Sequence, residues 1–312
     1  MGRLLWAVLL ALLTLVGCGR APEREVRVVV SGPGRLARAE AFAERLRGYG
    51  LERVRVTICD AGGDPEQLAT CAEGEPALFV TVGGVETRTV MEAGGTAPVI
   101  YVGLAASLDW GYVEALSRPG GRASGVDNNY AELSGKRLQL LALALPEVRR
   151  VAVLYQPGVV PTSRGLASVE DAARRLGLEL VYFPVERAEA LAGLSERLRA
   201  SGAEAALLMP SFVLENHLDA VVHATRTAGL PLVGLDAAQV EAGAFLAYGA
   251  SGAAMGRQAA RMARQVLEGY PVAEMPVERP QETALSIHLG AARALGLAPE
   301  PRVLDLADEV VR

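Results

Sequence analysis

Short apolar runs alternate with amphipathic stretches along most of the chain. Each run ends at or near a glycine or a polar turn, a pattern typical of strands that are buried on both faces. The stretches between them repeat their apolar residues with helical periodicity. The expected strands are 27–30, 54–58, 78–82, 99–102, 123–126, 151–155, 179–183, 205–209, 232–235, 245–248 and 284–289. This alternation predicts an α/β protein with doubly wound parallel sheets.

The expected helices fill the segments between these strands. They are 36–47, 85–91, 130–145, 163–176, 188–200, 216–227 and 253–268, followed by the last helices up to residue 310. Asn128 or Asn129 can cap the third of them, and Pro146 ends it. A turn cluster at 117–121, Ser-Arg-Pro-Gly-Gly, precedes this helix and marks the place where one βα series stops and another begins. The 312 residues, 51% of them hydrophobic, suffice for two lobes.

The N-terminus has the pattern of an exported lipoprotein. Arg3 is followed by an apolar run at 4–16, which is shorter than the roughly 20 residues that a membrane-spanning helix needs. Leu15-Val16-Gly17-Cys18 resembles a bacterial lipobox, which predicts a signal peptide at 1–17, lipidation of Cys18 and a tether at 18–25. The alternative is an ordinary signal peptide with an incidental cysteine. Either reading places the protein outside the cytoplasm, and lipidation would anchor it to the bacterial cell membrane.

Composition excludes several classes of function. The net charge of −5 and the absence of a basic cluster disfavour a nucleic-acid partner. The three histidines, His217, His223 and His288, lack the convergent spacing of a metal site. Neither a GxSxG elbow nor a P-loop is present. The sequence therefore predicts no metal, no cofactor and no catalytic residue.

One glycine pattern leaves an alternative open. Gly32, Gly34 and Ala37 follow the first strand with the spacing of a dinucleotide-binding turn, and Asp60 ends the next strand. Pro33 removes a backbone donor where a pyrophosphate needs amides. An exported α/β enzyme or dinucleotide-binding protein that uses this turn remains the alternative hypothesis.

Four segments together resemble a known family. They are SLDWGYVEALSRPGGRASGV, KRLQLLALALPEVRRVAVLY, VEAGAFLAYG and ALSIHLGAARALGL. In their order and spacing the chain resembles the substrate-binding lipoproteins of ABC importers with the type I periplasmic binding protein fold, specifically the family of the tryptophan- and tyrosine-type binding proteins. The resemblance implies a receptor without enzymatic activity, which closes two lobes on a small solute and docks to an ABC permease subunit.

The resemblance also implies how the chain divides. In the family the chain crosses between the lobes three times, and the expected crossings lie near 126, near 241–248 and near 276–283. Lobe one is then expected to contain 26–126 and 276–312, and lobe two 127–275.

Ligands of open α/β sheets bind outside the carboxyl ends of the strands, so residues at these ends are the candidate contacts. Gly83, Gly84 and Val85 begin a helix whose free amides suit a carboxylate, as do Thr162 and Ser163 in the second lobe. Asp127, next to Asn128, is the first candidate for binding an amine. The remaining candidates at these ends are Asp109, Trp110, Tyr155, Ser211, Asp236 and Tyr248. The expected ligand is an amino acid or a related carboxylate with an apolar or aromatic side chain.

Cys59 and Cys71 are the cysteines that remain after Cys18. An even pair in an oxidising compartment predicts a disulfide, which would close a short loop around the turn at 61–65. Two unpaired thiols are the alternative.

Overall fold

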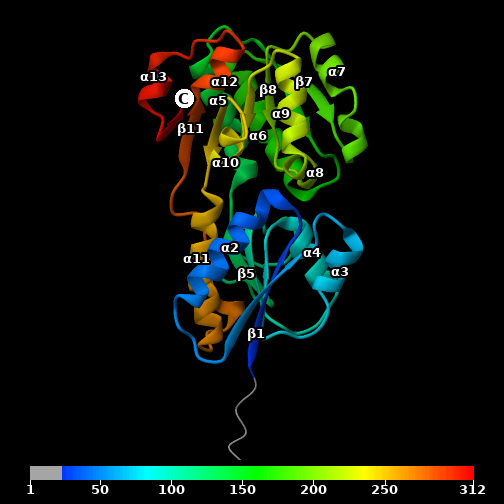
Figure 1. The fold of residues 1–312 in the computed structure, drawn as a ribbon, viewed down its shortest axis with the longest axis vertical. Helices are drawn as coiled ribbons and strands as arrows, with labels where there is room; N and C mark the ends of the chain where they lie inside the picture. Colours follow the sequence, from blue (N-terminus) through cyan, green and yellow to red (C-terminus); the bar gives the residue numbers. More distant parts are fainter. Residues whose placement is uncertain (1–22) are drawn as a thin grey trace, which may run out of the picture.

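A computed structural model describes residues 23–312, so the predicted signal peptide and Cys18 lie outside the described residues. The described chain forms two α/β lobes, which lie one above the other in Figure 1. Each lobe contains one mainly parallel sheet with helices packed against it. The predicted fold class is confirmed.

Lobe one is built on a five-stranded parallel sheet in the order β2-β1-β3-β4-β5. Its N-terminal elements are β1 (Arg24–Val30), α2 (Pro33–Arg47), β2 (Val54–Asp60), α3 (Pro65–Cys71), β3 (Leu78–Thr81), α4 (Gly84–Glu92), β4 (Val99–Leu104) and β5 (Ala123–Asp127). Strands β3 and β4 are buried along their whole length. Such strands have no solvent-facing side, which is why the sequence shows them as continuous apolar runs.

Lobe two is built on a seven-stranded sheet in the order β12-β11-β10-β9-β8-β6-β7. Its first part comprises α5 (Tyr130–Ala144), β6 (Arg150–Tyr155), α6 (Val160–Leu176), β7 (Glu179–Pro184), η1 (Ala188–Leu191), α7 (Leu194–Ala200), β8 (Ala205–Leu208), α8 (Phe212–Asn216), α9 (Leu218–Thr227), β9 (Leu232–Gly234), α10 (Ala237–Glu241) and β10 (Leu246–Gly249). Its last part comprises β11 (Ala284–His288), α12 (Leu289–Ala294), α13 (Pro301–Asp305) and β12 (Glu309–Val311). All neighbours in this sheet are parallel except β10 and β11.

The expected division of the C-terminal third between the lobes is wrong. Strand β11 pairs antiparallel with β10, so 284–312 complete lobe two instead of returning to lobe one. Residues 309–311 form a strand beside β11 where a helix was expected. Conversely, α11 (Gly252–Leu267), expected in lobe two, packs on α2 in the core of lobe one, followed by η2 (Val272–Glu274). A Cβ on Gly256 would lie 2.3 Å from the Arg38 carbonyl, so the two helices touch backbone to backbone.

Three segments connect the lobes, and two of them run side by side. The first follows β5 and the third follows η2, as expected from the resemblance. These two form a parallel bridge between Val126 and Glu278, with the Asp127 amide donating to the Glu278 carbonyl at 2.8 Å. The second crossing follows β10, a few residues later than expected.

Cys59 and Cys71 form a disulfide that joins the end of β2 to the end of α3, with their Cα atoms 5.7 Å apart. Cys71 is buried against Val29, Phe79 and Val90 of the same lobe. The bridge therefore fixes the short helix α3 against the sheet.

Replacing both cysteines with serine is expected to lower the free energy of unfolding by roughly 3 kcal/mol, because the bridge restricts the unfolded chain. Urea denaturation of the variant and of the unreduced mature protein measures this difference. Thiol titration of the unfolded, unreduced protein is the control, since two reactive thiols there would contradict the bridge.

Candidate functional site

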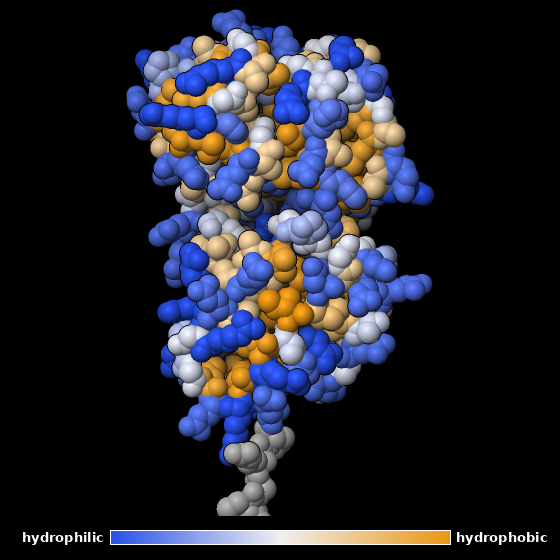
Figure 2. Space-filling model, viewed as in Figure 1, coloured by the Kyte–Doolittle hydropathy of each residue, from blue (hydrophilic) through white to orange (hydrophobic). Residues whose placement is uncertain are grey.

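A cavity of about 490 Å³ lies between the two lobes. Its walls come from the segments after β1, β3 and β4 in lobe one and from those after β6 and β8 in lobe two. These are carboxyl ends of parallel strands, where open α/β sheets bind their ligands. The volume is common for small-molecule sites. Figure 2 shows the molecule narrowing, with polar residues on the surface, where the lobes meet.

Aromatic side chains from opposite lobes contribute to the walls. The Trp110 indole donates to the Ala105 carbonyl at 3.1 Å and stacks on Tyr112, with ring centroids 5.8 Å apart. Phe212, the first residue of α8, faces the guanidinium of Arg35 at 5.0 Å. The cavity therefore offers a flat apolar surface on each side, which suits an apolar or aromatic group.

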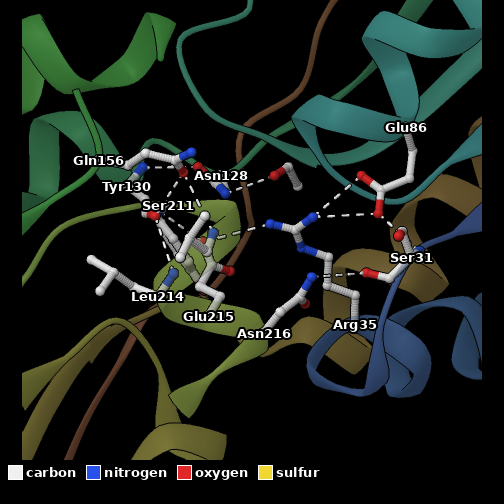
Figure 3. Close-up of polar contacts among 12 residues, drawn as sticks. Ser31, Arg35, Glu86, Asn128, Tyr130, Gln156, Ser211, Leu214, Glu215 and Asn216 are labelled. Carbon is white, nitrogen blue, oxygen red and sulfur yellow. Dashed lines mark hydrogen bonds and ion pairs between the residues drawn. The ribbon is translucent and has the colours of Figure 1, made fainter. Parts of the chain in front are cut away.

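Arg35 is the centre of a buried ion cluster that joins the lobes (Figure 3). Its Nη1 lies 3.3 Å from both carboxylate oxygens of Glu86, and its Nη2 lies 3.8 Å from Oε1 of Glu215 in lobe two. Glu86 is fully buried, and burial raises its pKa while Arg35 acts to lower it. The charges on Arg35 and Glu86 are therefore tolerable only because each has the other.

Ser31 lies next to this cluster at the end of β1. Its amide donates to Glu86 at 2.9 Å, and its carbonyl accepts a 3.4 Å hydrogen bond from Asn216 of lobe two. Its hydroxyl is buried and has no partner among the described residues, although Ser31 lines the cavity. The Nε of Arg35 is unpartnered in the same way. Both are donors that a ligand oxygen could satisfy.

The start of α4 brings free amides to the same wall. Gly83 has a φ of 114°, and a Cβ there would lie within 3.0 Å of Arg35 and Glu86. A Cβ on Gly84 would lie 3.1 Å from the Trp110 ring. The positive φ therefore favours glycine at position 83, and a side chain at position 84 would require a small shift of the Trp110 ring. The amides of Gly84 and Val85 belong to the first turn, where no helix carbonyl accepts them, and the helix dipole favours a negative group there.

The polar groups of lobe two are fixed by the start of α8. The Ser211 hydroxyl accepts from the Leu214 amide at 3.2 Å and donates to Gln156 at 2.9 Å. The Ser211 amide donates to Oε1 of Glu215 at 3.1 Å. These bonds hold the carboxylate of Glu215 at the cavity, facing Arg35 (Figure 3).

A second buried ion pair crosses between the lobes, with Arg38 lining the cavity and Asp236 outside its lining. Arg38 Nη2 lies 3.3 Å from Oδ2 of Asp236, and the Tyr130 hydroxyl donates to the same oxygen at 2.9 Å. Burial acts to lower the pKa of Arg38, but Tyr130 and Asp236 outweigh it and raise that pKa. Burial also raises the pKa of Tyr130. Asp236, which the sequence suggested as a ligand contact, thus pairs with Arg38 across the lobes and lies outside the cavity lining.

Six of the residues proposed from the sequence line the cavity: Gly83, Gly84, Val85, Trp110, Asn128 and Ser211. Asn128 is held by a 2.7 Å bond from its side-chain amide to the Gly103 carbonyl.

Asp127 and Asp109 lie elsewhere. Asp127 lines a separate cavity of about 240 Å³, and its carboxylate accepts from the Ser107 amide and hydroxyl and from the Asn129 amide. Asp127, the first candidate from the sequence for binding an amine, therefore lies outside the lining of the main cavity. Asp109 forms an ion pair with Arg164 of lobe two, with Nε and Oδ2 2.8 Å apart. Its hydrogen bond with Arg164 lowers the pKa of Asp109.

The other proposed contacts are also outside the lining. Tyr155 packs edge-on against Tyr182, and the Tyr248 hydroxyl accepts from Thr283 at 3.0 Å. Helix α6 begins at Val160, earlier than expected. Thr162 is consequently inside the first turn and bonds the Gln156 carbonyl, and Ser163 is exposed.

Sequence reasoning missed the charged lining residues Arg35, Arg38, Arg88 and Glu215, together with Ser31. The available signal was the position of Arg35 and Arg38 near the start of a helix that follows a buried strand. Such charges can equally belong to a solvent-exposed helix face. Whether they line a cavity instead depends on the position of the other lobe, which the local sequence does not show.

No helix within residues 23–312 is both long and apolar enough to cross a membrane. Over the same residues no group of His, Cys, Asp or Glu side chains is arranged to hold a metal ion.

Comparisons with known proteins agree with this architecture. The chain is 24% identical over 205 residues to a tyrosine-binding protein of Clostridioides difficile, an alignment that covers 64% of this chain and only 57% of that protein. A structure from Streptococcus pneumonia, described as an ABC domain in complex with L-Trp, superimposes with a TM-score of 0.84 at 20% identity, covering 93% of this chain and 100% of the other. The ligand-free, open structure of a Clostridium difficile substrate-binding protein gives a TM-score of 0.65 at 18% identity, covering 92% and 99%.

These neighbours support the type I periplasmic binding protein fold. A family model described as "ABC transporter substrate binding protein" matches residues 24–311, nearly all of the described chain. The chain belongs to the ABC transporter substrate-binding protein family, whose members are binding proteins and not enzymes.

Proposed function

We propose that this protein is the extracytoplasmic receptor of an ABC importer and binds an amino acid or a related carboxylate with an apolar or aromatic side chain. The observation that carries the proposal is the cavity between the lobes, where Trp110 and Phe212 lie near the free amides of Gly84 and Val85. Apolar walls with a few fixed polar groups are typical of binding sites for such solutes. The tyrosine-binding relative and the neighbour solved with L-Trp support the same class of ligand.

Transport follows from closure of the lobes. Interlobe contacts such as Arg35 with Glu215 and Arg38 with Asp236 can form only when the lobes are together. A ligand that bridges the cavity stabilises this closed state, which is the state that an ABC permease can recognise. Lipidation of Cys18, which lies outside the described residues, would hold the receptor at the membrane beside its permease.

A dinucleotide, the alternative ligand, would have little room at the Gly32–Gly34 turn. Asn216 of lobe two lies 2.6 Å from where a Cβ of Gly32 would be, and the Glu215 carbonyl is 3.2 Å from the same point on Gly34. The turn is thus covered by α8. A pyrophosphate would have to displace that contact.

Calorimetry with a panel of solutes tests the proposal. We expect heat from one or more of L-tryptophan, L-tyrosine, L-phenylalanine and L-leucine, or from their deaminated acids, with NAD, myo-inositol and nucleobases as controls. Mass spectrometry of ligand released from the purified, denatured protein provides an independent identification. Tight binding of NAD or a sugar, with no heat from any amino acid or carboxylate, would refute the proposal.

Fluorescence adds a test of where the solute binds. Trp110 is the single tryptophan in the described residues, so its emission should change when the solute and lobe closure remove water from the indole. Trp110→Phe should abolish the signal and still bind by calorimetry. An emission unchanged at saturating solute would place the solute away from this wall.

A further inference from the structure

We infer that the solute is a zwitterion, with its ammonium group at Glu215 in lobe two and its carboxylate at Ser31 and the first turn of α4 in lobe one. The inference rests on the proposed function, because it assigns the two charged ends of the same cavity.

The ammonium end is assigned from the bonds that Glu215 makes and does not make. Oε1 accepts from the Ser211 amide at 3.1 Å and lies 3.8 Å from Arg35 Nη2, which is longer than a hydrogen bond. Oε2 has no hydrogen bond to any described residue. Because its side chain is 12% exposed and lines the cavity, the free oxygen can accept a donor from the solute.

The carboxylate end is assigned from unpartnered donors. The hydroxyl of Ser31, a residue 1% exposed, has no partner among the described residues, and a buried hydroxyl without a partner is costly. Ser31 and Gly83 follow the adjacent strands β1 and β3, the Ser31 amide donates to Glu86, and a Cβ on Gly83 would lie 2.9 Å from Oε2 of Glu86. The hydroxyl and the amides of Gly84 and Val85 therefore belong to one wall. Together they can donate to both oxygens of a carboxylate.

The charged residues around the cavity favour the same orientation of the solute. Arg35, Glu86 and Glu215 carry one positive and two negative charges, so this cluster has a net charge of −1 and favours a cation. Arg88 extends from α4 into the lining, is exposed, and forms no ion pair with any described residue. Its charge offsets the cluster at the end where the helix dipole is also positive. A neutral molecule with separated charges fits this field better than a net cation or anion.

Two single substitutions test the ammonium end and the carboxylate end of the cavity separately. Glu215→Gln keeps the shape and the bond from the Ser211 amide but removes the charge, and Ser31→Ala removes a hydroxyl that has no protein partner. Glu241→Gln is the matched control, since Glu241 is an exposed carboxylate of lobe two outside the cavity. Each variant is tested by calorimetry against the four panel amino acids, their deaminated acids and their decarboxylated amines, which for L-tryptophan are indole-3-propionate and tryptamine.

We expect Glu215→Gln to weaken the amino acid by about 10- to 100-fold, the usual effect of losing one partner of a charged hydrogen bond, and to leave the deaminated acid unchanged. Ser31→Ala should weaken the amino acid and the acid by about 10-fold, because it acts on the carboxylate that both share. The decarboxylated amine should be insensitive to Ser31→Ala. Thermal unfolding without solute checks that both variants are folded, and Ser31→Ala serves alone if Glu215→Gln is not.

Two results would overturn the inference and leave the proposed function standing. One is a deaminated acid that binds wild-type protein as tightly as its amino acid. The other is an amino acid affinity that Glu215→Gln changes no more than Glu241→Gln does. Wild-type protein that binds neither the amino acids nor their acids would remove both the inference and the proposed function.

Discussion

Glu86→Ala is expected to lower the free energy of unfolding by about 3 to 5 kcal/mol, the usual cost when one partner of a buried ion pair is removed. The Arg35 guanidinium would stay in a position that is 5% exposed, with Glu215 at 3.8 Å as its remaining carboxylate. The Ser31 amide would also lose its acceptor. Chemical denaturation of the variant and the wild-type protein measures the loss.

A second variant distinguishes the loss of the ion pair from the cost of leaving one buried charge unpaired. Arg35→Leu with Glu86→Leu removes both charges, so it should cost less than Glu86→Ala alone. Glu268→Ala is the surface control, because its pair with Arg264 on α11 is about half exposed and such surface pairs contribute little to stability. If Glu86→Ala destabilised the protein no more than Glu268→Ala, the buried pair would have no structural role.

Asp236→Asn is expected to weaken solute binding by roughly 100- to 700-fold without touching the solute. The substitution leaves Arg38 buried without a counter-charge, which costs the closed state about 3 to 4 kcal/mol. Arg38 belongs to lobe one and Asp236 to lobe two, so opening the lobes relieves this cost by returning Arg38 to water. The free energy lost by the closed state is therefore taken from the affinity.

Calorimetry and small-angle scattering together test this mechanism. At a solute concentration that saturates wild-type protein, the variant should show a larger radius of gyration than wild-type protein, because its lobes stay open. Asp219→Asn, an exposed carboxylate of α9, is the control for the loss of one negative charge in lobe two. Unchanged affinity in Asp236→Asn would show that the pair contributes nothing to closure.

The strands and most helices followed from local pattern, but their assignment to lobes did not. The apolar run at 99–102 favours a buried strand, and β4 contains it and continues through Gly103 to Leu104. The apolar residues at 284–288 also indicate a buried strand, but they do not indicate which sheet edge this strand pairs with. That choice depends on the free edge of β10, and the placement of α11 depends on the close approach that Gly256 allows to α2.

The site was predictable where backbone geometry defines it. Gly83, Gly84 and Val85 line the cavity because a strand end followed by a helix start has a fixed place in an α/β sheet. The acidic residues were not predictable in this way. Asp127 satisfies neighbouring amides and Asp236 pairs with the other lobe, whereas Glu215 reaches the cavity from inside a short helix. Which carboxylate stays free depends on contacts between segments distant in sequence.

The position of α11 in lobe one has a consequence for how the chain folds. Its residues Met255, Ala259 and Met262 complete a core whose strands all lie before residue 128. A chain that appears in order from its N-terminus therefore cannot finish its first lobe until most of the second has appeared. Contacts between such distant segments slow folding. Neither lobe is a continuous piece of chain, so cutting the protein at any single crossing divides the core of at least one lobe between the two pieces.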